Sequence, residues 1–411
     1  MKKHILIVNQ HGENRGDEAA MRAMLSAFAT SLGDVEFTLI YQFRSRSLHL
    51  QFEQTVEALP MVLPPLEYLQ LLIFTLLKLA GIELNSILSP TLKAIVRAYR
   101  KTDLVVSAPG GPYFGDIYVN HEIFHWWFIL LGHLYRKPLF LYATSAGPFN
   151  IKPMNVVRRW LFRKFSRLVT REELSAAHIK KLLGKKTDVT ITADSAIQQI
   201  PETFPRAQYF ANRSTPSQEA LLVAISLNDY KYPGSNVPDH HKAEYDANMI
   251  ATLSYLAEKY SAYLMFFPQL YGGFHSDTPY LKKIANQLPA STRWEIVDQL
   301  ADSNLQRRLF AMCDLHVASR YHPAIFCNIT SVPGICIYYE HKALGFMQQL
   351  DLEKYAFDIW NLDRTKLCSA LDEIIENRPH LIAHLKGRAP TLRDRALKTT
   401  ELAVELMQRR A

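Results

Sequence analysis

The sequence is poor in cysteine. Its 411 residues include four cysteines, none of which form a CxxC pair, and three of them lie in apolar runs. This pattern is typical of buried thiols in a reducing compartment, and it argues against a disulfide framework or a cysteine zinc site. We therefore predict a cytoplasmic protein without a metal centre.

The chain also lacks the common nucleotide-binding and nucleic-acid-binding motifs. Gly12 and Gly16 lie between a predicted strand at 5–8 and a predicted helix at 18–28, but neither the GxGxxG nor the GxxxxGK[ST] spacing is present. A backbone nest for an anion at Gly16 and an ordinary tight turn capped by Asp17 both remain open. Lys and Arg number 47 against 39 Asp and Glu, a net charge of +8. This charge favours an anionic small molecule or a membrane surface as a partner, and we predict no nucleic acid.

No apolar run is long enough to predict a transmembrane helix. Residues 69–77 are strongly apolar, but charged residues bracket them on both sides. We predict a buried helix here. The alternative is a helix that lies in a membrane interface, which a second amphiphilic stretch at 124–132 also favours. Peripheral contact with the inner face of the cell membrane therefore stays open.

Apolar runs of strand length alternate with helical patterns along the chain. The predicted strands end in small polar or glycine-bearing loops, which is typical of doubly wound parallel sheets. They lie at 5–8, 37–41, 104–107, 139–143, 168–170, 221–226, 262–267, 315–318 and 334–338. A basic helix around 158–167 is expected to turn most of its charges to solvent. Because 201–219 is polar and proline-bearing, we predict an α/β protein with domains at 1–205 and 206–385, and a C-terminal helix at 386–411 that packs back across them.

The most informative stretch connects a predicted strand to a predicted helix. The apolar run 315–318 predicts a buried strand, and Pro323 predicts a helix start. Between them stand Arg320, Tyr321 and His322. Ligands bind at the carboxyl ends of strands in such sheets, and helix N-termini favour anions. Arg320 and His322 would therefore hold a phosphate or carboxylate and move a proton; the alternative is a surface arginine and a histidine bonded to backbone.

Seven short segments together resemble the polysaccharide pyruvyl transferase family. In the family's order, they lie at 14–19, 108–111 with Asp116, 145–149, 170–175, 193–194, 319–322, and 339–342 with 345–346. The resemblance implies two Rossmann-like domains facing each other across a cleft, similar to the GT-B arrangement. It also implies a reaction in surface-polysaccharide biosynthesis that moves the enolpyruvyl unit of phosphoenolpyruvate onto two hydroxyls of one sugar. The products would be a pyruvate ketal and phosphate, with phosphoenolpyruvate as co-substrate and no cofactor.

This resemblance implies a set of cations for the donor. Phosphoenolpyruvate carries a phosphate and a carboxylate, and arginine matches either group with paired hydrogen bonds. Arg171 and Arg320 each follow a predicted strand, one in each domain, and we expect them to clamp the donor with Lys342 as a third cation. For Arg171 an ion pair with Glu172 or Glu173 remains the alternative, and for Lys342 a solvated lysine.

Histidines would move the protons. We predict His322 as the general acid, because imidazole titrates near neutrality. The resemblance implies a second histidine just after the glycine loop, and His121 and His125 are both candidates, with His121 preferred. Four residues apart, they would share one helix face; metal binding and a purely structural role are the alternatives.

Backbone and aromatic contacts complete the predicted substrate site. Gly110 and Gly111 would let a ligand approach the backbone closely. Gly16 would offer an amide to an anion, and Tyr321 stands where the family more often has leucine. The expected partners are phosphoenolpyruvate and a sugar acceptor, with a lipid-linked oligosaccharide as one option.

Two other classes of function are compatible with the pattern. A GT-B glycosyltransferase would use the same cleft with a nucleotide sugar. A non-catalytic sugar-binding or membrane-binding protein is less consistent with the presence of Arg171, Arg320, His322 and Lys342 together.

Overall fold

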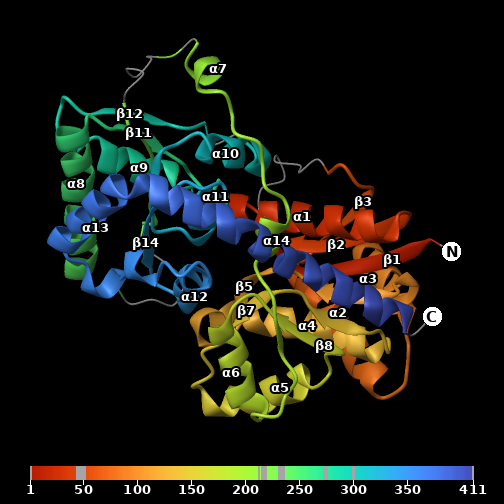
Figure 1. The fold of residues 1–411 in the computed structure, drawn as a ribbon. Helices are drawn as coiled ribbons and strands as arrows, with labels where there is room; N and C mark the ends of the chain where they lie inside the picture. Colours follow the sequence, from red (N-terminus) through yellow and green to blue (C-terminus); the bar gives the residue numbers. More distant parts are fainter. Residues whose placement is uncertain are drawn as a thin grey trace. The chain divides into compact units, whose positions relative to one another are not determined.

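The computed structural model describes residues 2–42, 52–211, 213, 220–229, 237–271, 276–298 and 301–409. The chain divides into two compact units (Figure 1). Unit 1 comprises Met1–Glu13, Ala20–Gln198 and Arg395–Ala411, and unit 2 comprises Asn14–Ala19 and Gln199–Asp394. The short segment Asn14–Ala19 belongs to unit 2 although unit 1 flanks it on both sides, a feature that no local sequence pattern indicates.

Unit 1 contains a parallel sheet with seven strands among the described residues, in the order β3-β2-β1-β4-β6-β8-β9. The strands are β1 (Lys3–His11), β2 (Val35–Gln42), β3 (Val56–Pro60), β4 (Leu104–Ser107), β6 (Leu139–Leu141), β8 (Arg167–Thr170) and β9 (Thr190–Ile191). The chain adds strands outward in one direction from β1 and then in the other from β4. The topological switch point of this sheet, where ligands bind in such folds, therefore lies between β1 and β4.

Helices of unit 1 connect these strands, as Figure 1 shows. They are α1 (Arg15–Leu32, whose first residues belong to unit 2), α2 (Pro65–Leu79), α3 (Pro90–Lys101), α4 (Val119–Leu134), α5 (Lys152–Phe162) and α6 (Glu173–Leu183). Two further strands, β5 (Gly110–Phe114) and β7 (Thr144–Ala146), pair in parallel with each other. Both segments are predicted as loops from the sequence, and this prediction is wrong. Each strand forms only through pairing with the other, which is distant in the sequence, so no local pattern reveals it.

Unit 2 contains a parallel sheet with six strands among the described residues, in the order β12-β11-β10-β13-β14-β15. The strands are β10 (Leu222–Ser226), β11 (Tyr263–Phe266), β12 (Arg293–Ile296), β13 (Leu315–Ala318), β14 (Gly334–Tyr338) and β15 (Ala356–Asp358). The direction of strand addition reverses between β10 and β13, which places the switch point there. The predicted α/β class with two Rossmann-like parallel sheets is confirmed.

The helices of unit 2 include two that lie side by side at its margin in Figure 1, α8 and α13. The helices are α7 (Arg206–Phe210), α8 (Asp239–Tyr260), α9 (Thr278–Ala285), α10 (Ser303–Phe310), α11 (Tyr321–Ile329), α12 (His341–Gln349), α13 (Arg364–Glu376) and α14 (Arg378–Gln408). The hydroxyl of Tyr255 on α8 donates to Asp372 on α13 at 2.6 Å. The C-terminal helix predicted at 386–411 begins earlier, at Arg378, and its residues from Arg395 onward belong to unit 1.

Two predicted helix starts are too late, by three residues for α1 and by two for α11. Helix α1 begins at Arg15, and Asn14 caps it instead of Asp17, because the Gly16 amide donates to Asn14 Oδ1 at 2.9 Å. Helix α11 begins at Tyr321, ahead of Pro323. Proline is tolerated there because the amides of the first helical turn have no partner within the helix.

The basic helix α5 does not turn all of its charges to solvent. Arg158 is fully buried, with Nε 2.9 Å and Nη2 2.6 Å from the two carboxylate oxygens of Glu122. Its Nη1 lies 2.6 Å from Asp116 Oδ1. The prediction of a solvated face is wrong for this residue, because helix α4 brings Glu122 beneath α5.

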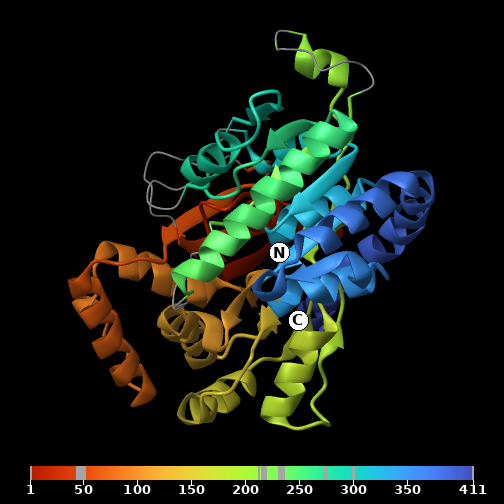
Figure 2. The ribbon, with the colours of Figure 1, turned by 90° about the vertical axis from the view of Figure 1, so that its left-hand side faces the viewer.

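Helix α2 corrects another expectation. It buries only Leu71, Phe74 and Thr75 and leaves most of its large apolar side chains exposed, so the prediction of a buried helix at 69–77 is wrong. Figure 2 shows α2, in orange, at the margin of unit 1. In the described segments of the chain, no helix is both long enough and apolar enough to cross a membrane.

Because three histidines are buried, we expect the protein to lose stability in acid. The pKa values of His4, His125 and His316 are each lowered to about 4, chiefly by burial. Because histidine in an unfolded chain titrates near about 6.5, the unfolded state binds protons first as the pH falls. The free energy of unfolding should therefore be highest above about pH 6.5. At about pH 4.5 it should be lower by about 2 kcal/mol for each histidine.

Urea unfolding at neutral and acidic pH measures this loss. The variant His316→Gln keeps a side-chain donor for the Val332 carbonyl, which His316 Nδ1 contacts at 3.0 Å. It should lose about a third of the pH dependence, since one of three titrating groups is removed. An unfolding free energy that does not change with pH would contradict the prediction.

Candidate functional site

The carboxyl edge of the unit 2 sheet collects the predicted donor-binding residues. The segments 267–271, 319–322 and 339–342 directly follow β11, β13 and β14. All these strands are parallel, so the segments emerge at the same edge. The loop after β13, which carries Arg320, Tyr321 and His322, lies at the switch point of the sheet.

The start of helix α1 joins this edge. Asn14 forms an antiparallel bridge with Leu270, and the Arg15 amide donates to the Gln269 carbonyl at 3.0 Å. A Cβ atom on Gly16 would overlap Nδ1 and Cγ of His322, so the backbone of α1 lies directly on the imidazole ring. The Gly16 amide itself donates to Asn14 Oδ1, so the prediction that it offers its N–H to an anion is wrong. What the start of α1 brings beside His322 is the positive end of the helix dipole, which favours an anion.

The contact between Gly16 and His322 predicts that glycine is required at this position. Gly16→Ala should displace the His322 ring and lower the free energy of unfolding by about 1–3 kcal/mol, as overpacking does. The matched control is Gly387→Ala in helix α14, where an added Cβ meets nothing within 4 Å. That variant should be neutral or stabilising by about 0.5–1 kcal/mol. Urea unfolding and the NMR signals of the His322 ring test both expectations; equal effects of the two substitutions would contradict them.

Arg320 is held in place by an acidic partner. Its guanidinium forms an ion pair with Asp277, whose other oxygen accepts the amides of Gln269 and Leu270 at 3.0 Å each. Tyr339 lies nearby: burial raises its pKa and the positive charge of Arg320 opposes the rise. Arg320 is therefore an oriented cation at the sheet edge and not a mobile surface arginine.

Lys342 is also oriented, so the alternative of a solvated lysine is wrong. Its ammonium lies 2.6 Å from Glu340 Oε2, and its side chain is 12% exposed. It lies 5.8 Å from the centre of the Tyr321 ring, which packs edge-on against His322 with ring centres 5.0 Å apart. Unit 2 therefore brings together Gly16, Arg320, Tyr321, His322 and Lys342.

In unit 1 the glycine loop adopts a backbone that requires glycine. Gly110 and Gly111 have φ angles of 117° and 95°, which side-chain-bearing residues rarely adopt. A Cβ on Gly111 would lie 2.6 Å from the Tyr113 amide. These residues open β5, close to the switch point at the end of β4.

Arg171 contacts the backbone of this loop. Its Nη1 lies 2.6 Å from Asp194, its Nε donates to Ser145 Oγ at 2.7 Å, and its Nη2 donates to the Gly111 carbonyl at 3.4 Å. Asp194 is thus an ion-pair partner of Arg171 that the sequence did not indicate, where Glu172 and Glu173 were the predicted alternatives. The Arg171 side chain is 1% exposed. Such burial is more consistent with a residue that positions the glycine loop than with a residue that contacts the donor.

A histidine cluster lies beside the same switch point. His125 is buried, with Nδ1 3.0 Å from the Tyr113 carbonyl and Nε2 3.0 Å from Nε2 of His11. A carbonyl oxygen can only accept a hydrogen bond, so Nδ1 of His125 carries the proton. Nε2 of His125 then has no proton and accepts the hydrogen bond that His11 Nε2 donates. His11 stacks on the Tyr113 ring at 4.8 Å, and its ring centre is 6.2 Å from that of His121.

His11 is not among the site residues predicted from the sequence. The available signal was its position, directly after the strand that borders the switch point. Within the described residues, no group of three or more His, Cys, Asp or Glu side chains is arranged to hold a metal ion.

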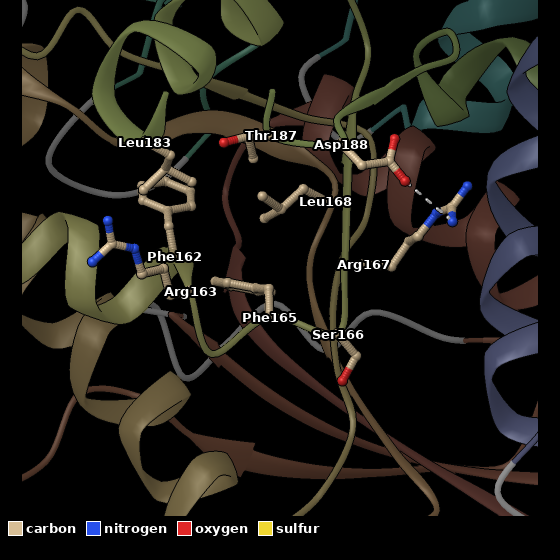
Figure 3. A pocket seen from close by; sticks show the side chains of 9 residues that line it. All are labelled: Phe162, Arg163, Phe165, Ser166, Arg167, Leu168, Leu183, Thr187 and Asp188. Carbon is tan, nitrogen blue, oxygen red and sulfur yellow. Dashed lines mark ion pairs between the residues drawn. The ribbon is translucent and has the colours of Figure 1, made fainter. Parts of the chain in front are cut away.

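A cavity of about 240 Å³ lies elsewhere in unit 1 (Figure 3). It is lined by Phe162, Arg163, Phe165, Ser166, Arg167, Leu168, Leu183, Thr187 and Asp188. Arg167 pairs with Asp188 at 3.6 Å, and Figure 3 shows Arg163 pointing away from the cavity. None of the predicted site residues lines it, so we do not place the reaction there.

Comparison with known proteins gives a sequence relative and solved structures of similar fold. The amylovoran biosynthesis protein AmsJ of Erwinia amylovora is 23% identical over 392 residues, which cover 91% of this chain and 92% of that protein. The crystal structure of HepE from Anabaena in complex with UDP and glucose has a TM-score of 0.62 at 12% identity, covering 99% of this chain and 100% of that one. Sucrose-phosphate synthase from Thermosynechococcus elongatus has a TM-score of 0.63 at 13% identity, with the same coverage. At such identities the two structures show similarity of fold alone.

The family comparison reaches further. The model of the polysaccharide pyruvyl transferase family matches residues 14–341. This range begins at the segment that packs on His322 and includes the glycine loop, Arg171 and Arg320. The chain therefore belongs to the polysaccharide pyruvyl transferase family.

Proposed function

We propose that this protein transfers the enolpyruvyl unit of phosphoenolpyruvate to two hydroxyls of one sugar, forming a pyruvate ketal during polysaccharide biosynthesis. One observation carries the proposal: Arg320, His322, Lys342 and the amide end of α1 at Gly16 meet at the switch point of one sheet. Two cations and a helix N-terminus suit a donor with a phosphate and a carboxylate. A histidine among them suits a reaction that must move protons near neutral pH.

Arg320 and Lys342 bind the two anionic groups of the donor in this proposal. Each is already paired with one carboxylate, from Asp277 and Glu340 respectively. These partners fix the direction of the cations, and each cation can make several hydrogen bonds, since guanidinium has five N–H donors and ammonium three. The Gly16 amide end adds its dipole to the phosphate.

His322 donates the proton that starts the reaction. The methylene carbon of phosphoenolpyruvate gains this proton, and positive charge builds on the neighbouring carbon that bears the phosphate oxygen. One sugar hydroxyl adds to that carbon and loses its proton. The bond to the phosphate oxygen then breaks, phosphate leaves, and the second hydroxyl adds and loses its proton. The two hydroxyls release two protons in all. These balance the proton gained by the methylene carbon and the proton taken up by the departing phosphate, and a histidine can exchange them.

We assign the acceptor side to unit 1. His125 is buried with both ring nitrogens engaged, so His121 is the better candidate to remove a proton from the sugar. The backbone of Gly110 and Gly111 would allow close approach of the sugar. Arg171 would act by positioning that backbone.

We also propose that this reaction takes place in the cytoplasm. The four cysteines are free thiols, and three are buried. Burial raises the pKa of Cys336 to about 12, which keeps its thiol protonated and unreactive. Buried, unpaired cysteines support a reducing compartment.

The test is incubation of the purified protein with phosphoenolpyruvate and a panel of lipid-linked and nucleotide-linked saccharides. We expect one saccharide to gain the mass of a pyruvate ketal, with an equal amount of phosphate released. Calorimetry with phosphoenolpyruvate alone should show donor binding. Absence of donor binding, together with release of a nucleoside diphosphate from a nucleotide sugar, would contradict the proposal and favour glycosyl transfer.

A further inference from the structure

Helix α2 presents an apolar face to solvent. We call this the α2 face; it consists of Leu66, Leu69, Leu72, Ile73, Leu76 and Leu79, which are 43% to 66% exposed. The opposite side of the helix packs on α4, where Trp127 Nε1 donates to Thr75 Oγ1 at 2.9 Å and Tyr68 contacts Phe124. The helix is therefore anchored through one side and leaves an apolar stripe on the other.

Helix α5 also exposes large apolar side chains. Val156, Val157 and Trp160 are exposed there, and they form what we call the α5 face. Helix α4 connects the two faces, because its His133 packs edge-on against Trp160, with ring centres 5.9 Å apart. Ile123, also on α4, is 54% exposed. Large exposed apolar side chains of three neighbouring helices therefore belong to one part of unit 1.

A group of basic residues accompanies the α5 face. This basic cluster consists of exposed residues on α5, on α6 and in the loop that follows α6: Lys152, Arg159, Arg163, Lys181, Lys185 and Lys186. Arg159 joins the two helices, because its Nε donates to the Leu182 carbonyl at 3.0 Å. Nearby Asp188 pairs with Arg167 outside the cluster. The α5 face is thus accompanied by net positive charge.

We propose that the α2 and α5 faces rest on an anionic phospholipid membrane, with the basic cluster against its headgroups. An apolar stripe with a tryptophan and flanking lysine and arginine is the composition of helices that lie in a membrane interface. With 15 residues, α2 is shorter than the roughly 20 that cross a bilayer, so it fits contact along its side. A symmetric contact with a second copy would bring one basic cluster toward another, which charge repulsion disfavours. The inference does not depend on the proposed reaction.

Sedimentation of the full chain with phospholipid vesicles tests this proposal. We expect binding to vesicles of phosphatidylcholine mixed with phosphatidylglycerol, and much weaker binding to phosphatidylcholine alone. Leu69→Gln with Leu76→Gln should weaken binding by at least about tenfold, because both side chains leave the apolar contact. Lys185→Gln with Lys186→Gln should weaken it by about 25-fold at low salt, at about fivefold for each charge.

Matched controls change the same residue types on unit 2. Ile200→Gln with Trp360→Gln removes two exposed apolar side chains, and Lys366→Gln with Lys386→Gln removes two exposed charges. Both pairs should bind vesicles like the original chain. Far-UV circular dichroism checks that every variant is folded, which exposed positions should permit. Equal binding of all variants, no binding of the original chain, or an original dimer that Leu69→Gln with Leu76→Gln converts to a monomer would each overturn the proposal.

Discussion

The variant His322→Ala is expected to lose about a thousandfold in turnover, while its Kd for phosphoenolpyruvate stays within about threefold. The proposed role of His322 is proton transfer to the methylene carbon, and the anions of the donor are held by other groups. Removing the imidazole therefore affects the transition state more than the bound donor. Phosphate release measured at saturating donor gives the turnover, and calorimetry gives the Kd.

Two comparisons separate this chemical role from a structural one. Arg320→Ala should have the converse effect and weaken donor binding by about thirtyfold, since it removes a charged hydrogen-bond donor. His380→Ala changes an exposed histidine of unit 2 and should leave both quantities unchanged. Full turnover in His322→Ala would refute the role assigned to it. Equal loss of binding and turnover would show that His322 holds the donor and does not serve the proton transfer alone.

The variant Arg158→Met is expected to lower the free energy of unfolding by about 3–5 kcal/mol. Arg158 and Glu122 are both fully buried, and the arginine satisfies both carboxylate oxygens. Burial raises the pKa of Glu122 even with Arg158 beside it, which shows how strongly this site disfavours the charge. Without the arginine the carboxylate stays buried with no cation, and this cost is the source of the destabilisation.

The pH dependence distinguishes this mechanism from simple loss of packing. Glu122 in Arg158→Met should take up a proton more readily when folded than when unfolded. The folded state then binds more protons, so the variant should lose stability as the pH rises above about 4.5 and be closer to the original chain in mild acid. Urea unfolding at several pH values measures this difference.

Matched variants complete the test of the buried pair. Arg163→Met changes an exposed arginine immediately after the same helix and should alter stability by no more than about 0.5 kcal/mol. The double variant Arg158→Met with Glu122→Gln should recover part of the loss, because no charge is left buried. A double variant less stable than Arg158→Met alone would rule out the buried charge as the cause.

The sequence by itself determined the class of fold and the order of its motifs. Runs such as 5–8, 222–225 and 335–337 are apolar, and the structure buries all of them. These signals are local: a strand buried on both faces must be apolar throughout, and the loops after such strands carry the polar residues. Local signals also identified Arg320, His322 and the glycine pair as candidates.

Only the tertiary structure decided which of these residues meet. The segment Asn14–Ala19 joins unit 2 and sets Gly16 on His322, and His11 pairs with His125. The same holds for the exposure of α2 and the burial of Arg158, which depend on what each helix packs against. An apolar or charged helix face has the same periodicity whether a neighbour covers it or not, so the sequence pattern cannot distinguish the two cases. Such contacts join residues that are far apart in the chain, and no local pattern encodes their partners.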